Sequence, residues 1–597
     1  MGAVVRRYFK VTGATWRFAW SLRPGLLSVV TSLFIVSALI TFARSGTQAL
    51  LINDLLRGAG TGVWTGRIAL WIGLYIMVRF IPDIVSYLRD YLSWIMWFQI
   101  DETWNVRFLK KRSELDIAAH ENPRIQNLLT RVGEAGSYRV SNMSDRNTYI
   151  CESALEVLIA AGILIAFNLP TALIILATLI PALIVEIKYA DSIWGIDVAN
   201  SELRRRYWHI KNHFVGLGSL IELKLGGLAP DFLKRVGSYF KVFRGTQEET
   251  RRVKFWRSSV ANVITYIGFI TGAVWAISAV LHGAMQIGTF TFFLASLADL
   301  RVGLSTLFMN LARQYADARF AEEFFEVLTL EDTVKKSEHP IVLAKIKTPE
   351  IRFENVSFSY PNTKTPVLKN INLVIPAGEK FAIVGVNGAG KTTLIKLLAR
   401  FYDPTKGRIL IDGTDLREIE LSSWYHHLGA LFQDYTRYEF SVEEAVSVTR
   451  PEFKMLRAKV KKAAEESEAS TFIEAWGKQY RQQLGNQYKG GLEPSTGQWQ
   501  KLALARTFYR DPRIFILDEP TASIDAEAEA NIFDRLEKLP GDRTVILISH
   551  RFSTVRHADR IAIIEGGTIT ELGSHEELLA KEGTYAHLFR LQAKGYE

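Results

Sequence analysis

Long apolar runs dominate the first half of the chain and predict a helical membrane domain. Six runs have the length or the apolarity to cross about 30 Å of hydrocarbon. An aromatic and basic segment at residues 3–22 precedes them and is typical of a helix lying in the membrane interface. The six runs lie near residues 25–52, 64–98, 149–167, 169–187, 258–281 and 287–311.

The pattern of apolar and polar positions changes after residue 330. From Ile351 onward, short β-branched runs alternate with helical patterns, as in a mainly parallel α/β sheet. The chain therefore divides into a transmembrane domain at 1–330, a polar linker at 331–350 and an α/β domain at 351–597.

Basic residues set the expected orientation of the spans. The loops at 99–148 and 188–257 are rich in Lys and Arg, whereas the turns at 168–169 and 282–286 contain neither residue type. Because loops rich in these residues stay on the cytoplasmic side, both termini and the α/β domain should be cytoplasmic. The expected location is the plasma membrane, which in a bacterium is the inner membrane.

Composition excludes several other classes of protein. The net charge is +10, but no basic helix or aromatic-basic module typical of nucleic-acid binding is present. The single cysteine, Cys151, excludes an internal disulfide and a cysteine-built metal site. Arg6 and Arg7 precede aromatic residues rather than a short apolar core, so we expect no cleavable signal peptide.

The α/β domain is organised around a glycine loop at residues 385–393. A strand-like run at 381–384 precedes the loop and a helical pattern at 394–400 follows it. In that context backbone N–H groups and the helix N-terminus surround nucleotide phosphates. Lys391 would reach the β- and γ-phosphates, and the Thr392 hydroxyl would bind Mg²⁺. The loop, which predicts a P-loop nucleotide site, consists of Gly385, Val386, Asn387, Gly388, Ala389, Gly390, Lys391, Thr392 and Thr393.

Two further buried strands end in candidate catalytic residues. The run 514–517 leads to Asp518 and Glu519, and the run 545–548 leads to His550. At the carboxyl edge of a parallel sheet these side chains would lie beside the phosphate loop. There we expect Asp518 to hold Mg²⁺, Glu519 to polarise the attacking water and His550 to contact the γ-phosphate.

These motifs resemble those of the ATP-binding cassette (ABC) ATPase family over nearly all of 351–597. Residues 385–393 match its Walker A motif, and residues 514–519 match its Walker B motif. The resemblance implies hydrolysis of ATP with Mg²⁺, stacking of Tyr360 on the adenine, and a Q-loop residue, Gln433, at the Mg²⁺ and the catalytic water. The remaining matches are Asp525 in the D-loop, His550 as the switch histidine, and Ser495, Gly497 and Gln498 in the signature motif.

The signature motif departs from the family pattern. The family reads Leu-Ser-Gly-Gly-Gln, whereas this chain reads Pro494-Ser495-Thr496-Gly497-Gln498. A Ser N-cap on a helix N-terminus still forms an anion site for the γ-phosphate of ATP on an opposing subunit. The Cβ of Thr496 hinders the closest approach. We therefore expect a homodimer with two somewhat slow sites, and the alternative is a heterodimer with a degenerate partner site.

The first half resembles the membrane domain of a half-size ABC exporter of the bacterial peptide, lipid or drug type. The resulting fold class is an all-α six-span transmembrane domain followed by an α/β P-loop nucleotide-binding domain. Short coupling helices that dock on the nucleotide-binding domain are expected at 117–127 and 206–220, and ordinary apolar contact between helices is the alternative. The resemblance implies ATP-driven export by a dimer in the lipid bilayer. We expect no peptidase domain before the first span, so that a peptide cargo would be trimmed elsewhere. A lipid flippase and an exporter-fold importer are the alternatives, whereas six spans exclude a soluble P-loop kinase or regulatory ATPase.

Charged residues fall inside several of the predicted spans, including the first, the second and the sixth. Arg44 lies in the first span, Arg79 and Asp83 lie four positions apart in the second, and Asp299 and Arg301 lie in the sixth. Because charge in hydrocarbon is costly, these side chains should pair or face a wet cavity. Pairing between helices or subunits is the simpler expectation, and a lining of the substrate cavity is the alternative.

Overall fold

Two compact units make up the computed structural model of the protein. It describes residues 2–61, 66–135, 138–199, 201–344, 347–361, 363, 365–448, 455–521, 523–539, 541–549 and 551–593. One unit comprises Met1–Glu114 with Asn127–Leu330, and the other comprises Leu115–Gln126 with Glu331–Glu597. Residues 115–126 therefore belong to the second unit, although they lie between two helices of the first in sequence.

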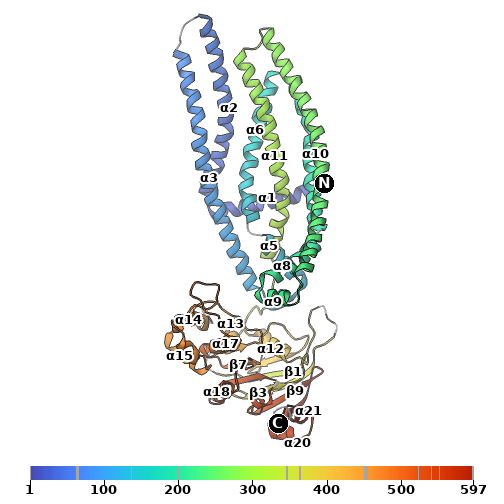
Figure 1. Ribbon diagram of the computed structural model, residues 1–597, viewed down its shortest axis with the longest axis vertical. Coiled ribbons are helices and arrows are strands. Elements are labelled where there is room, and N and C mark those ends of the chain that lie inside the picture. The colour runs from blue at the N-terminus through green and yellow to red at the C-terminus, as the bar shows by residue number, and fades with distance from the viewer. Residues whose placement is uncertain are drawn as a thin grey trace. The chain divides into compact units, whose positions relative to one another are not determined.

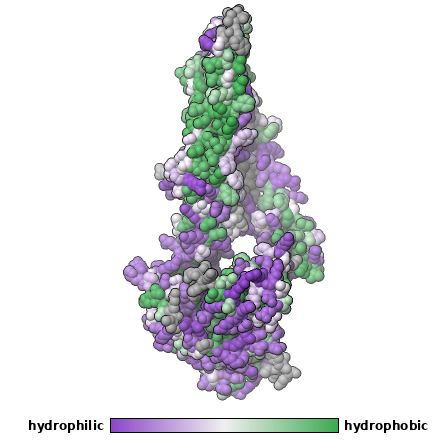
Figure 2. All heavy atoms as spheres, turned by 90° about the vertical axis from the view of Figure 1, so that its left-hand side faces the viewer, coloured by the Kyte–Doolittle hydropathy of each residue, from purple (hydrophilic) through white to green (hydrophobic). Residues whose placement is uncertain are grey.

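The first unit is helical, with long helices side by side and α1 lying across them (Figure 1). Among the described residues, six helices are long and apolar enough to cross a membrane, which confirms the six predicted spans. Figure 2 shows the broad hydrophobic surface on one face of this unit. The helices are α1 (Gly2–Leu22), α2 (Pro24–Thr61), α3 (Gly66–Glu114), α6 (Tyr138–Phe167), α7 (Leu169–Ala199), α8 (Ser201–Val215), α9 (Leu217–Leu225), α10 (Ala229–Leu281) and α11 (Ile287–Leu328), and α5 (Pro123–Ala135) begins in the second unit.

Several helices extend well beyond the predicted spans. α10 has 53 residues, of which the hydropathy pattern marked only 258–281. Its polar first half continues the same backbone hydrogen bonding, because Lys, Arg and Glu are good helix formers. The segment 117–127 forms α4 (Ile117–Glu121) and the start of α5, and the segment 206–220 forms parts of α8 and α9. Residues 64 and 65 of the second predicted span lie outside the described residues.

Polar contacts join the helices of the first unit. Asn53 Oδ1 on α2 accepts a hydrogen bond of 2.7 Å from the backbone N–H of Gly288, in the first turn of α11. This contact satisfies a donor that a helix N-terminus otherwise leaves free. Asp317 on α11 pairs with Arg146 at 2.7 Å and with Arg139 at 3.4 Å, both on α6. These contacts tie α11 to α2 and α6.

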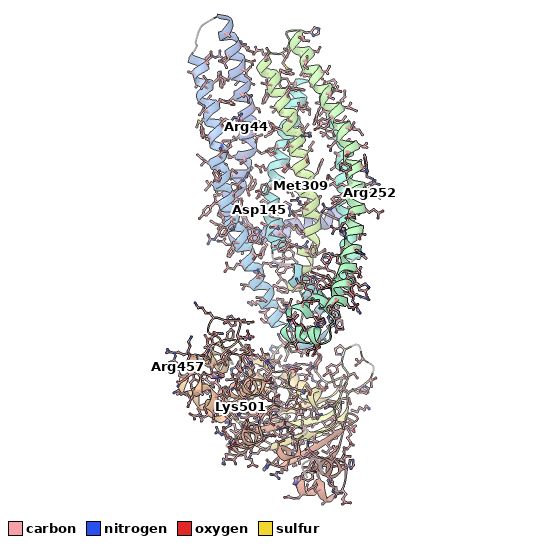
Figure 3. The ribbon with its side chains drawn as sticks, in the orientation of Figure 1. Arg44, Asp145, Arg252, Met309, Arg457 and Lys501 are labelled. Atoms are coloured by element: carbon pink, nitrogen blue, oxygen red, sulfur yellow. The ribbon has the colours of Figure 1, made fainter. Side chains whose placement is uncertain are left out.

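Arg79 and Asp83 do not form an ion pair within the described part of the chain. Arg79 instead donates a hydrogen bond of 3.0 Å to the Tyr75 hydroxyl one turn earlier, and both charged side chains are exposed in the single chain. By contrast, Asp299 on α11 interacts electrostatically with Arg44, whose place on α2 is seen in Figure 3. Arg44 and Asp299 therefore attract each other from two different helices, whereas the two charges of α3 do not pair within the described residues.

The second unit contains two sheets, whereas the alternating pattern predicted only a mainly parallel one. An antiparallel sheet has the order β2-β1-β4-β5, and a mainly parallel sheet has the order β10-β9-β3-β8-β7-β6. The strands are β1 (Ile351–Phe358), β2 (Leu368–Ile375), β3 (Lys380–Val384), β4 (Lys406–Ile411), β5 (Thr414–Asp415), β6 (Leu428–Leu431), β7 (Ile514–Asp518), β8 (Thr544–Ile548), β9 (Arg560–Glu565) and β10 (Thr568–Gly573).

Helices cover the parallel sheet and bury its central strands on both faces. Along β7, Ile514 and Ile516 join one hydrophobic core with α12, whereas Phe515 and Leu517 join another with α14 to α18. Such burial on both faces explains the continuous apolar runs of these strands. The helices are α4, α12 (Lys391–Leu398), α13 (Leu421–His427), α14 (Val442–Ser447), α15 (Arg457–Glu466), α16 (Ser470–Ala475), α17 (Thr496–Arg510), α18 (Ala526–Glu537), α19 (Phe552–Val555), α20 (His575–Ala580) and α21 (Thr584–Ala593), with short 3₁₀ turns at Leu416–Glu418 and Gln479–Arg481.

Candidate nucleotide site

The glycine loop connects β3 to α12, as its sequence context predicted. Gly388 and Gly390 have φ angles of 82° and 106°, which residues with a side chain rarely adopt. A Cβ at Gly390 would also lie only 2.7 Å from Leu368 Cδ2. Glycine at these positions therefore lets the loop turn tightly into α12, whose first N–H groups lack partners within the helix and suit an anion.

The Lys391 ammonium lies against the glycine loop. Its Nζ donates hydrogen bonds to the carbonyl oxygens of Gly385 at 2.7 Å and Val386 at 3.1 Å. Burial lowers the pKa of Lys391, and the charges of Glu519 and Asp518 offset this effect only in part. Because the nearby carboxylates compensate the Lys391 ammonium only in part, it is suited to bind the negatively charged oxygens of a phosphate.

Thr392 and Asp518 form the part of the site that suits Mg²⁺. The Thr392 hydroxyl donates a hydrogen bond of 3.2 Å to Asp518 Oδ2 at the end of β7. Burial raises the pKa of Asp518, although the Thr392 hydrogen bond opposes the shift. A hydroxyl and a desolvated carboxylate are the hard oxygen donors that Mg²⁺ takes together with nucleotide phosphates. Within the described residues no cluster of three His, Cys, Asp or Glu side chains suits a metal held by protein alone.

Glu519 follows β7 in an unusual backbone conformation. Its φ angle is 50°, and its N–H donates a hydrogen bond of 2.9 Å to the carbonyl of Ile548 on β8. A positive φ is uncommon outside glycine and is found at functional sites. The Glu519 carboxylate accepts a hydrogen bond of 3.3 Å from Gln433 Nε2, just after β6. Two residues that are 86 positions apart thus meet at one sheet edge.

A cavity of about 850 Å³ brings most of the predicted residues together. Its size is typical of a small-molecule site. Tyr360 lies at its edge, where the hydroxyl is 3.1 Å from Thr393 Oγ1. Ala389 is buried beneath the loop. The predicted residues that line the cavity are Tyr360, Gly385, Asn387, Gly388, Gly390, Lys391, Thr392, Thr393, Gln433, Asp518 and Glu519.

The signature residues do not line this cavity. Ser495 caps α17 in a reciprocal capping box with Gln498, as expected for a Ser N-cap. A Cβ at Gly497 would lie 2.5 Å from the carbonyl oxygen of Ser523, so only glycine fits there. Asp525 caps α18, and its Oδ2 atom lies 3.5 Å from the Nζ atom of Lys501 on α17. Lys501 is labelled in Figure 3. His550 lies outside the described residues.

The sequence analysis missed Gln500. This buried side chain on α17 donates a hydrogen bond of 3.0 Å to the Glu519 carbonyl and accepts one of 2.9 Å from the Ser523 N–H. It therefore links the signature helix to the backbone of Glu519. The available signal was a glutamine on the apolar face of a predicted helix, where a buried amide must find hydrogen-bonding partners.

Comparison with known proteins agrees with this geometry. Residues 368–522 match the family model described as ABC transporter. The chain is 29% identical over 509 residues to the subtilin transport ATP-binding protein SpaT of Bacillus subtilis, covering 85% of this chain and 82% of the relative. It is 27% identical over 556 residues to the nisin transport ATP-binding protein NisT of Lactococcus lactis subsp. lactis, covering 93% and 91%. A bacterial Atm1-family ABC exporter with ATP bound has the same fold, with a TM-score of 0.79, 24% identity and coverage of 95% of this chain and 98% of that one.

Proposed function

We propose that this chain is a half-size exporter of the ABC transporter type, and that two copies bind ATP between their α/β domains and hydrolyse it to export a substrate. The observation that carries this proposal is the convergence of Lys391, Thr392, Asp518 and Glu519 on one cavity, in a chain whose described part has six helices able to cross a membrane. The family match supports ATP as the nucleotide.

Each residue around the cavity has a role that suits its chemistry. The loop N–H groups and Lys391 bind the β- and γ-phosphates. Thr392 and Asp518 would hold Mg²⁺, which supplies positive charge against the phosphates. Glu519 polarises the attacking water, and Gln433 holds its carboxylate through the 3.3 Å hydrogen bond. For His550, which follows β8 in the sequence but lies outside the described residues, we propose contact with the γ-phosphate.

A second copy would complete each site. Ser495, Gly497 and Gln498 do not line the cavity of their own chain, which leaves them for the γ-phosphate in a partner's cavity. The N-terminus of α17, capped by Ser495, suits that anion. We favour a homodimer, in which both sites carry the same Thr496-containing signature, over a heterodimer.

We place the protein in the bacterial inner membrane with both termini and the α/β domain in the cytoplasm. Support comes from the Lys- and Arg-rich loops at 99–148 and 188–257. The relatives are bacterial transport proteins, named for subtilin, for nisin and, in one Bacillus subtilis protein 33% identical over 334 residues, for putative multidrug export. We accordingly propose a peptide, lipid or drug-like substrate for this chain.

Reconstitution of the purified chain in liposomes tests this function. Subtilin, nisin, phospholipids and a panel of drugs are added in turn while ATP hydrolysis and ATP-driven movement of the added molecule are measured. We expect one class to stimulate hydrolysis and to move away from the side that carries the α/β domain, with Glu519→Gln as the inactive control. Absence of hydrolysis, or movement toward the α/β domain, would contradict the proposal.

A further inference from the structure

Glu121, the last residue of α4, contacts two side chains of the α/β domain. Its carboxylate accepts a hydrogen bond of 2.8 Å from Lys396 Nζ and another from the Tyr402 hydroxyl. Lys396 lies on α12, the helix that follows the glycine loop. A residue of the first cytoplasmic loop thus touches the helix that begins at the phosphate site.

The rest of α4 is held firmly enough to define the position of Glu121. Ala118 and Ala119 are buried. Asp116 caps α4 by accepting a hydrogen bond of 2.6 Å from the Ala119 N–H, and its other oxygen accepts one of 2.6 Å from the Val334 N–H. Cap and burial together restrain this short helix, which alone would be unstable in water.

Lys396 also lies over the ring of Tyr360. Its Nζ is 5.6 Å from the ring centroid, within the range of a cation–π contact. The Tyr402 ring meets Tyr360 edge-on, with centroids 5.4 Å apart and planes at 88°. Tyr360 lines the nucleotide cavity, whereas Lys396 and Tyr402 lie outside its described lining. The ammonium thus lies over the Tyr360 ring and outside the cavity lining, a position that we describe below as behind Tyr360.

Both members of the Glu121–Lys396 pair are charged at neutral pH. Burial alone would raise the pKa of Glu121, but hydrogen bonds from Lys396 and Tyr402 outweigh burial and lower it. Burial would likewise lower the pKa of Lys396, but the contacts with Glu121 and Tyr360 outweigh it and raise the pKa. The cation behind Tyr360 is thus stabilised by the carboxylate of α4.

We propose that Glu121 is a positioning residue that strengthens ATP binding by holding the Lys396 ammonium behind Tyr360. The inference rests on the proposed binding of ATP and on the stacking of adenine on Tyr360 that the family resemblance implies. A cation on one face of an aromatic ring reduces the negative potential of the opposite face, and this weakens its repulsion with the π-cloud of a stacked base. Because linkage is reciprocal, bound ATP strengthens the seating of α4 by the same factor.

Equilibrium ATP binding to the full-length protein in lipid nanodiscs provides the first test. Glu121→Ala should raise the Kd for ATP about threefold to tenfold, and Lys396→Met should do the same. Glu114→Ala is the matched control, because Glu114 is an exposed carboxylate of the neighbouring helix α3 that pairs with Lys110 at 3.8 Å. An unchanged Kd in both Glu121→Ala and Lys396→Met would overturn the inference.

Charge reversal separates positioning from simple structural pairing. The double variant Glu121→Lys, Lys396→Glu restores an ion pair but places an anion behind Tyr360. We expect it to recover the melting temperature lost in either single reversal and to keep the raised Kd for ATP. Recovery of wild-type ATP affinity in the double variant would show that only the ion pair matters and would overturn the inference.

Amide hydrogen exchange tests the reciprocal effect. ATP should slow exchange in residues 115–122 of the wild type and leave these amides unchanged in Lys396→Met. Equal protection in both proteins would contradict the linkage.

Tyr360→Ala separates the stacking role of Tyr360 from the positioning role of Glu121. Normal ATP affinity in that variant would remove the stacking role itself. A raised Kd in Tyr360→Ala beside a normal Kd in Glu121→Ala would reject only the role of Glu121.

Discussion

The Thr392 hydroxyl lies 3.2 Å from the Oδ2 atom of Asp518, although 126 positions separate the two residues in sequence. Thr392 follows β3, Asp518 ends β7, and β8 lies between these two strands in the sheet. The parallel pairing of β3 with β8 and of β8 with β7 sets their ends at one edge. This contact joins the two residues proposed to hold Mg²⁺.

Asp518→Asn should raise the melting temperature of the nucleotide-free protein and strongly lower the rate of ATP hydrolysis. Burial raises the pKa of Asp518, so the folded state binds the proton more tightly than the unfolded state. Stability from this group therefore falls as pH rises from the unfolded pKa through the raised folded pKa. At neutral pH the asparagine removes the destabilising effect of the buried carboxylate. Mg²⁺-dependent ATP turnover should nevertheless drop at least about 100-fold.

Calorimetry without nucleotide and a steady-state ATPase assay measure these two effects of Asp518→Asn. Asp534→Asn is the control, because Asp534 pairs with Lys538 on the exposed side of α18. A melting temperature below wild type for Asp518→Asn would mean that the carboxylate stabilises the empty site, contrary to the argument from burial.

Glu519→Gln should lower ATP turnover at least about 100-fold while ATP still binds. The amide retains the shape of the side chain and can still contact Gln433, but it polarises water poorly. Single-turnover hydrolysis and equilibrium ATP binding measure the two steps separately. Hydrolysis close to wild type would remove Glu519 from the catalytic role.

Lys391→Ala should instead weaken ATP binding itself. The substitution deletes a charge-assisted hydrogen bond to phosphate, which is among the stronger polar contacts in proteins at about 1.5–3 kcal/mol. The Kd for ATP should therefore rise by about tenfold or more, and Lys538→Ala should leave it unchanged. Unaltered ATP affinity in Lys391→Ala would contradict the assignment of the phosphate site.

Tyr360→Ala should raise the Kd for ATP several-fold, because stacking on a base contributes about 1–3 kcal/mol. Tyr360→Trp retains an aromatic face and should keep most of the affinity, although it loses the contact with Thr393. Normal binding by the alanine variant would identify Tyr360 as a packing residue beside Tyr402.

A smaller residue at position 496 and a larger residue at position 497 should change the rate of ATP hydrolysis in opposite directions. Thr496→Gly should speed hydrolysis by about twofold to fivefold if its Cβ hinders closure of the two copies. Gly497→Ala should abolish activity, because its Cβ would lie 2.5 Å from the Ser523 carbonyl.

The chain expressed alone should form a homodimer. Mass measurement in lipid should show a dimer, and its ATP hydrolysis should be cooperative. A monomer, or a dimer inactive until a second half-transporter is added, would contradict the homodimer.

The sequence by itself determined the class of this protein, because each decisive feature lies in contiguous residues. Six apolar runs long enough for the bilayer predict the spans without knowledge of their packing. Likewise, the glycines at 388 and 390 encode a positive φ locally, and a buried strand ending in Asp518 and Glu519 places both at a sheet edge. Periodicity, glycine conformation and strand direction are local properties, so the fold class and the core of the candidate site could be predicted.

Only the tertiary structure decided which distant side chains meet. The order of β3, β8 and β7 brings Thr392 to Asp518, and the packing of α17 places Gln500 beneath the Glu519 carbonyl. The hydropathy pattern underestimated the length of α10. It marks only the part of the helix that is apolar enough to cross a membrane, whereas the helix continues as long as its backbone hydrogen bonds continue. Glu121 meets Lys396 across 275 positions, and no periodicity within either segment reports that contact. Such contacts depend on how whole helices and strands pack against each other. The free energy that stabilises this packing comes from many residues that lie far apart in the sequence.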